Sequence, residues 1–118
     1  MNMKEFSNIV GLSPHTLRYY EKIGLLKNVH RNTSGHRAYT SRNIEWVSFV
    51  NRLKETGMPL ANIIEYATLR ELGSNTALER QMLLEQHQES LKIHIQQQQK
   101  HLAALAHKIS QYKEGKVS

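Results

Sequence analysis

The chain has 118 residues, a length that suits one compact domain with at most one extended element. Its 16 lysine and arginine residues against 10 aspartate and glutamate residues give a net charge of +6, and residues 1–57 hold nine of the basic but four of the acidic ones, so we expect this part to meet a polyanion. The lack of cysteine excludes disulfides, thiolate metal sites and thiol redox sensing, and without a secretory leader or an apolar run of about 20 residues we expect a cytoplasmic protein that does not enter membranes.

Two short helices joined by a tight turn open the chain. The first is predicted over about residues 3–10, with Asn2 as its N-terminal cap. The second runs from Pro14 to about Ile23, because Ser13 is a good cap and proline suits the first helical position. This arrangement is typical of a helix-turn-helix.

The second of these helices has two different sides. Leu17 and Tyr20 form its predicted buried side. The remaining polar and basic side chains are suited to phosphates and base edges. They are His15, Thr16, Arg18, Tyr19 and Lys22.

Residues 29–39 predict a small basic hairpin. Asn32–Gly35 is a turn signal between two short alternating stretches. Alternation places Arg37 and Tyr39 on the same face of the second strand. A basic hairpin directly after a helix-turn-helix is interpreted as a wing.

Two further helices are predicted to complete the head. One covers about residues 41–55, and the other opens at Pro59 and ends before the break at residues 73–75. Their inward-facing residues are predicted to be Ile44, Val47, Val50, Leu60, Ile63, Ile64 and Ala67.

The last predicted helix, residues 76–113, is too long for the core of so small a head. Its apolar residues follow a heptad repeat, with glutamine at three of the eleven seam positions. A helix with such a seam needs a second chain to cover it, so we expect a homodimer through residues 76–112. The predicted seam residues are Leu84, Leu91, Ile95, Leu102, Leu105 and Ile109. We therefore expect two domains, a DNA-binding head over residues 1–73 and a dimerisation helix with a short tail over residues 74–118.

Residues 12–26, 31–39 and 57–60 together resemble the MerR family of transcriptional regulators in its short form. The resemblance covers about residues 1–112. It implies a mainly α-helical fold, with a winged helix-turn-helix head and a long helix that forms an antiparallel coiled coil in a dimer. It also implies sequence-specific binding to double-stranded promoter DNA, bending and undertwisting of an overlong spacer, and RNA polymerase as a partner at the promoter.

The resemblance and the physics of phosphate and base contacts together indicate one set of DNA-binding residues. Arg37 and Tyr39 of the wing should reach phosphates beside the groove, as the matching family positions do. The expected contacts are Ser13, His15, Thr16, Arg18, Tyr19, Lys22, Arg31, Arg37 and Tyr39.

Residues 46–52 and 64–66 look most like the family branch that responds to aldehydes and nitrosative stress. That branch commonly carries a reactive cysteine where Arg52 stands here, so this chain lacks the thiol on which that response depends. We interpret Arg52 as a surface cation, with mimicry of an activated state as the alternative. Two other branches of the family differ from this sequence. Metal-sensing branches need cysteines, which are absent here, and drug-sensing branches append a large ligand domain to the coil.

Three histidines, His87, His94 and His101, recur every seven residues beside the seam. They could bind a metal or titrate near neutral pH, but we interpret them as a solvated flank. No metal site, cofactor or catalytic residue is predicted, and an enzyme is disfavoured. The alternative function is a coiled-coil adaptor without specific DNA binding.

Overall fold

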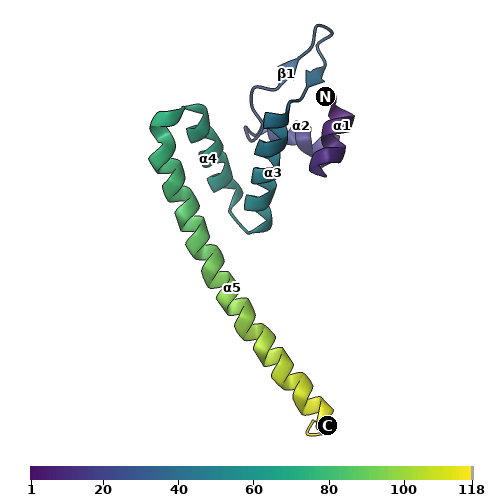
Figure 1. Cartoon of the computed structure of the whole chain (residues 1–118), viewed down its shortest axis with the longest axis vertical. Coiled ribbons are helices and arrows are strands. Elements are labelled where there is room, and N and C mark those ends of the chain that lie inside the picture. Colours follow the sequence, from purple (N-terminus) through teal and green to yellow (C-terminus); the bar gives the residue numbers. More distant parts are fainter. Residues whose placement is uncertain (118) are drawn as a thin grey trace. The chain divides into compact units, whose positions relative to one another are not determined.

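The computed structural model describes residues 1–117, and most of them are helical. Figure 1 follows the elements from the N-terminus in purple to the C-terminal end in yellow. The expected fold class, mainly helical with a small hairpin and a long C-terminal helix, is confirmed. The elements are α1 (Met3–Val10), α2 (Pro14–Lys22), β1 (His30–Arg31), β2 (Arg37–Ala38), α3 (Ser41–Glu55), α4 (Leu60–Glu71), the 3-10 turn η1 (Ser74–Thr76) and α5 (Ala77–Lys113).

Two compact units divide the chain. The first covers Met1–Leu83 and the second begins at Leu84. The predicted division into a DNA-binding head over residues 1–73 and a dimerisation helix with a short tail over residues 74–118 stays a prediction.

Three helices of the first unit, α1, α2 and α3, begin where the sequence offers side-chain caps. The Asn2 side chain accepts a hydrogen bond from the Glu5 backbone N–H at 2.9 Å, and Ser13 accepts one from Thr16 at 3.1 Å. At α3, Thr40 and Asn43 form a reciprocal capping box. These bonds pair N–H groups that lack partners within the helix, which explains why the predicted starts agree with the structure.

The core of the first unit is built from the inner sides of its helices and the segments between them. α1 packs against both α2 and α3 (Figure 1). Tyr20, expected in the core, is buried as predicted. The buried apolar side chains are Phe6, Leu17, Tyr20, Leu25, Leu26, Tyr39, Trp46, Val47, Val50, Leu53, Met58, Ile63 and Ala67.

The prediction that Leu60 faces the core is wrong. Leu60 is 40% exposed, whereas Met58 is buried. Leu60 is the first residue of α4 and directly follows the N-cap residue Pro59. The chain fills the core with Met58 before the helix starts, and Ile63 is the first residue of α4 to be buried.

An aromatic cluster joins α3 to α4. The ring centroid of Trp46 lies 6.0 Å from that of Tyr66, with the rings nearly parallel, and Phe49 is tilted against both. The Arg70 guanidinium lies over the Trp46 ring at 4.3 Å. Aromatic and cation–π contacts depend on geometry, so they restrain the relative position of the two helices more than apolar burial alone would.

The wing is shorter than the expected stretch of residues 29–39. His30 pairs with Ala38, and Arg31 pairs with Arg37, in an antiparallel register. The turn between the strands is closed by the Asn32 side chain, which accepts hydrogen bonds from the backbone N–H groups of residues 34 and 36. The amide of Asn32 therefore replaces ladder bonds that a longer hairpin would make.

Helix α5 has no buried residue within this chain. Large apolar side chains along it remain exposed, including Leu102 at 67%. None of the helices in residues 1–117 is long and apolar enough to cross a membrane.

Candidate nucleic-acid interface

Helix α2 presents a basic and aromatic surface because its apolar side is fully used in the core. Leu17 and Tyr20 are at most 2% exposed. Arg18 and Tyr19, which lie between them in the sequence, are exposed instead. His15 and Lys22 are exposed as well, whereas Thr16 is half-buried. The structure thus brings the predicted recognition residues to the outer side of one short helix.

The start of α2 has two hydroxyl groups with defined hydrogen bonds. Ser13 accepts from the Thr16 backbone N–H and donates its own hydroxyl proton to the Thr16 side chain at 3.0 Å. The Thr16 hydroxyl therefore keeps its proton available for an acceptor outside the chain. Ser13 acts first as a helix cap, so any contact it makes with DNA is additional to a structural role.

A bidentate ion pair connects the wing to α2. Arg37 Nε and Nη2 donate to the two carboxylate oxygens of Glu21 at 2.9 and 3.1 Å. The two side chains are 25% and 20% exposed. Hydrogen bonding to Glu21 raises the pKa of Arg37, against the lowering effect of burial. Arg37 was expected to contact phosphate, and the structure shows that this guanidinium already braces the wing against the recognition helix.

The structure corrects the expectation for Tyr39, which was placed on an outward face with Arg37. The Tyr39 side chain is 2% exposed, and its ring stacks on Phe6 with centroids 4.1 Å apart. Its hydroxyl donates to the Met3 sulfur at 3.5 Å. Strand β2 ends at Ala38, so strict alternation does not continue to this residue. Tyr39 is therefore a core residue that anchors the end of the wing.

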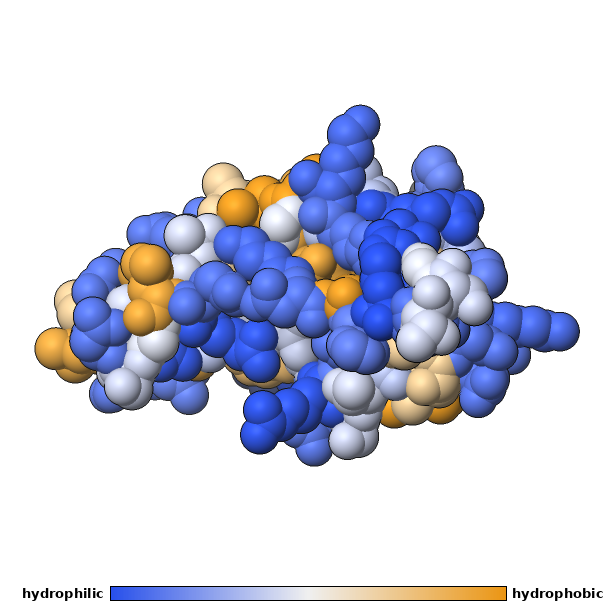
Figure 2. Space-filling model, turned by 90° about the horizontal axis from the view of Figure 1, so that it is seen from above, coloured by the Kyte–Doolittle hydropathy of each residue, from blue (hydrophilic) through white to orange (hydrophobic). Residues whose placement is uncertain are grey.

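The tip of the wing remains polar and exposed. Arg31 donates from Nη1 to the backbone oxygen of Gly35 at 3.0 Å, which ties the first strand to the turn. Gly35 has a φ of +80°, a conformation that glycine adopts without strain. Seen from above in Figure 2, the surface is mostly hydrophilic, with hydrophobic side chains in separate small areas. The exposed cation of Arg31 is what suits the wing to a polyanion.

Sequence reasoning missed Glu21 as a member of this site. Glu21 lies on a helix 16 residues before Arg37, which lies on a strand. Helical and strand periodicities do not extend across the loop between them, so they cannot predict this contact. The only available signal was an acidic residue within an otherwise basic recognition helix. Its role becomes evident only when the fold brings the two side chains together.

The six predicted dimerisation residues lie on α5, and none of them is fully buried within the chain. Leu84 and Leu91 are half-buried. The other four, Ile95, Leu102, Leu105 and Ile109, are 47–67% exposed. Among the described residues, no group of three histidine, cysteine, aspartate or glutamate side chains is placed to hold a metal ion. His87, His94 and His101 accordingly form no metal-binding cluster within one chain.

The head with its short recognition helix and wing defines a winged helix-turn-helix protein, and two family models match the chain. The model described as "MerR HTH family regulatory protein" matches residues 1–69, and that described as "MerR, DNA binding" matches residues 44–109. The chain belongs to the MerR family of DNA-binding transcriptional regulators.

Relatives and solved structures agree with this assignment. An HTH-type transcriptional regulator from Haemophilus influenzae is 36% identical over 108 residues, which cover 92% of this chain and 80% of that protein. The crystal structure of a MerR family regulator from Listeria monocytogenes has a TM-score of 0.91 and 35% identity, covering 96% of this chain and 86% of that one.

A second solved structure concerns DNA directly. HiNmlR, a MerR family regulator lacking the sensor domain, was crystallised bound to promoter DNA. It has a TM-score of 0.88 and 34% identity to this chain, covering 98% of this chain and 91% of that one.

Proposed function

We propose that two copies of this chain pair through α5 and regulate transcription by binding one promoter with both heads. The observation that carries the proposal is the exposed set of recognition residues on α2, held beside the wing by the Glu21–Arg37 ion pair. A basic helix alone would bind any polyanion. A helix and a wing fixed to each other present phosphate and base contacts in one arrangement, which is what sequence specificity requires.

The proposed DNA contacts divide by chemistry. Arg18, Lys22 and Arg31 carry exposed cations suited to phosphates, and the Tyr19 hydroxyl adds a donor. His15 and Thr16, early on α2, are the candidates for base edges. Arg37 keeps a phosphate contact only through guanidinium hydrogens that Glu21 does not bind. Tyr39 is left out of the set because its hydroxyl faces Met3.

Dimerisation is supported by the exposed seam of α5. The helix has 37 residues, so at about 1.5 Å per residue it is roughly 55 Å long. Leaving its leucine and isoleucine side chains in water costs about 0.8 kcal/mol for each CH₂ group that a partner could cover. A second copy offers the matching heptads, and seam glutamines such as Gln88 and Gln98 favour one register. By family resemblance the pair is antiparallel.

Promoter distortion and RNA polymerase complete the proposal, and both rest on family resemblance. HiNmlR, a similar regulator, binds promoter DNA. A dimer with two heads can bend and undertwist a spacer when its contacts are made only to the distorted DNA. Polymerase would then read both promoter elements of an overlong spacer.

The test begins with selection of bound sequences from random duplex DNA, followed by anisotropy titrations on the selected operator. An inverted repeat with a steep salt dependence is expected. Arg18→Ala should lower the salt slope by about one. Lys92→Ala, an exposed cation on α5, is the matched control and should leave both affinity and slope unchanged. Recovery of no common sequence would contradict specific binding and favour the adaptor alternative.

A further inference from the structure

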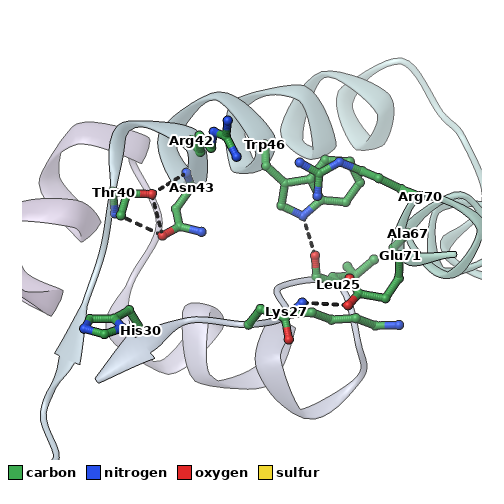
Figure 3. Close-up of a pocket in the computed structure, with 11 residues that line it drawn as sticks. Leu25, Lys27, His30, Thr40, Arg42, Asn43, Trp46, Ala67, Arg70 and Glu71 are labelled. Carbon is green, nitrogen blue, oxygen red and sulfur yellow. Dashed lines mark hydrogen bonds between the residues drawn. The ribbon is translucent and has the colours of Figure 1, made fainter. Parts of the chain in front are cut away.

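The head contains a cavity of about 290 Å³ that the DNA-binding proposal does not use. It lies between the segment after α2, strand β1, α3 and α4 (Figure 3). None of its lining residues belongs to the proposed DNA contacts. Its volume is at the lower end of the range for small-molecule pockets, which limits an occupant to a compact molecule.

Positive charge dominates the lining of this cavity. Lys27 lies in the segment after α2, Arg42 on α3 and Arg70 on α4, and all three are exposed. The one carboxylate is that of Glu71, whose Oε1 accepts a hydrogen bond from Asn28 Nδ2 at 2.6 Å. The acid is therefore partly engaged by the wall of the cavity, and three cations against one carboxylate in the lining favour an anion.

Asn43 supplies an oriented neutral donor. Its side-chain oxygen accepts hydrogen bonds from the backbone N–H and the hydroxyl of Thr40, at 3.0 and 3.2 Å. These bonds fix the amide so that its nitrogen points into the cavity (Figure 3). An amide held in this way can donate to an oxygen atom without first losing rotational freedom.

Trp46 forms a rigid wall of the same cavity. Its Nε1 donates to the Leu25 backbone oxygen at 2.6 Å, and the side chain is 8% exposed. The Arg70 guanidinium lies over the indole ring at 4.3 Å, so the ring restrains it. The N–H groups at the edge of the guanidinium remain able to donate hydrogen bonds. Arg70 and Tyr66 cover much of the indole, so Trp46 offers a ligand only a narrow apolar edge beside the guanidinium. This combination suits a small molecule that carries an oxyanion on a compact apolar body.

We propose that this cavity binds a small oxyanion, either a carboxylate or a phosphate monoester, whose apolar body is no larger than an aromatic ring. Arg42 and Arg70 bind the oxyanion, Asn43 donates to it, and Trp46 contacts the body. Such a ligand is an effector of the regulator, and that role rests on the proposed function. The lining joins the segment that leads into the wing to α3 and α4, so a ligand there restrains the wing relative to the rest of the head.

Direct binding is testable without DNA because Trp46 is the only tryptophan of the chain. The full-length protein is titrated with benzoate and with phenyl phosphate while tryptophan fluorescence is recorded, and calorimetry gives an independent dissociation constant. Benzamide is the neutral control, and inorganic phosphate shows whether the apolar body contributes. A saturable response to one or both anions, weaker by at least about tenfold for benzamide, is expected.

Matched variants locate the site. Arg42→Gln and Lys27→Gln remove cations from the lining without removing a hydrogen bond to the rest of the chain that the structure shows. Arg42→Gln is expected to weaken binding about tenfold or more and Lys27→Gln less, whereas Arg52→Gln, an exposed arginine of α3 outside the cavity, should have no effect. No saturable response, or equal affinity in the Arg42 and Arg52 variants, would overturn the site.

The effector role has its own readout. Binding of the ligand and of the operator are coupled reciprocally. If the ligand changes the affinity for the operator by some factor, the operator must change the affinity for the ligand by the same factor. A shift of about fivefold or more in operator dissociation constant is expected with saturating anion, and none in Arg42→Gln. Anion binding without any shift would overturn the effector role and leave DNA binding intact. Loss of operator binding in the ligand-free protein would instead contradict the proposed function.

Discussion

Glu21 and Arg37 join the recognition helix to the wing through two hydrogen bonds of 2.9 and 3.1 Å. Both side chains are mostly buried, so this pair is screened less than an ordinary surface ion pair. The carboxylate also places a negative charge inside a surface that should meet phosphates. The Glu21 carboxylate is explained there if the ion pair holds the wing in place. Removing Glu21 would make the DNA-binding surface more positive, but the wing would no longer be fixed to α2.

The first prediction separates a brace from a phosphate contact. Glu21→Gln removes a negative charge, so it should strengthen operator binding if Arg37 acts only by contacting phosphate. We expect the opposite, a loss of about fivefold or more, because the wing is no longer fixed to α2. Anisotropy titrations of Glu21→Gln, Arg37→Ala and the double variant measure this. Single losses that add fully in the double variant would contradict the brace, since coupled residues are not additive.

The second prediction concerns Tyr39 and alkaline pH. Burial, with a smaller effect of Glu21, raises the pKa of Tyr39 above its ordinary value of 10.0. The unfolded chain therefore ionises this phenol before the folded chain does. The stability that results is fully present below about pH 10 and is lost as the pH rises through the raised folded value. Urea unfolding at pH 8 and pH 10.5 should show a smaller loss for Tyr39→Phe than for the unchanged protein.

The same variant checks the position of Tyr39. Tyr39→Phe keeps the ring stacked on Phe6 and removes only the hydroxyl, which donates to Met3. Operator affinity and its salt slope should stay within about twofold of the unchanged protein. A uniform loss of affinity with a slope lower by about one would restore Tyr39 as a phosphate contact.

The third prediction tests the seam of α5. Leu91→Asp combined with Ile95→Asp should give monomers in light scattering and weaken operator binding sharply, because charges cannot be buried unpaired between two helices. The control uses the same spacing outside the seam, Ile93→Asp with Gln97→Asp. Ile93 and Ile95 are both 47% exposed in the single chain, so only the heptad assignment distinguishes them. Equal dissociation by both pairs, or by neither, would contradict the seam.

Local rules predicted much of the fold. The starts of α1 and α2 were predicted from Asn2 and Ser13, since a cap acts within a few residues of its own position. The structure adds Thr40 as the cap of α3. The bounds of α3 were predicted without error. The length of α5 was predicted to within one residue, because no proline or glycine interrupts its heptads.

Relationships between distant segments could not be predicted in the same way. Tyr39 was misplaced because alternation was continued beyond a strand of two residues, whereas its ring position depends on Phe6, 33 residues earlier. The cavity beside Trp46 is built from four separate segments, and no sequence pattern relates them. Periodicity gives the inner side of an element, but it does not indicate which element packs against it.

The last prediction concerns thiol chemistry at Arg52, the position at which the resembling family branch commonly has a reactive cysteine. The chain has no cysteine, and nitrosothiols transfer their nitroso group to a thiolate. A nitrosothiol should therefore change neither the mass of the protein nor its operator affinity. Arg52→Cys is the matched positive control, because Arg52 is exposed on α3 and a thiol there is accessible to the reagent. Mass spectrometry should detect one nitroso group on that variant and none on the unchanged protein. A rapid and reversible loss of operator binding by the unchanged protein would show that another group senses the reagent.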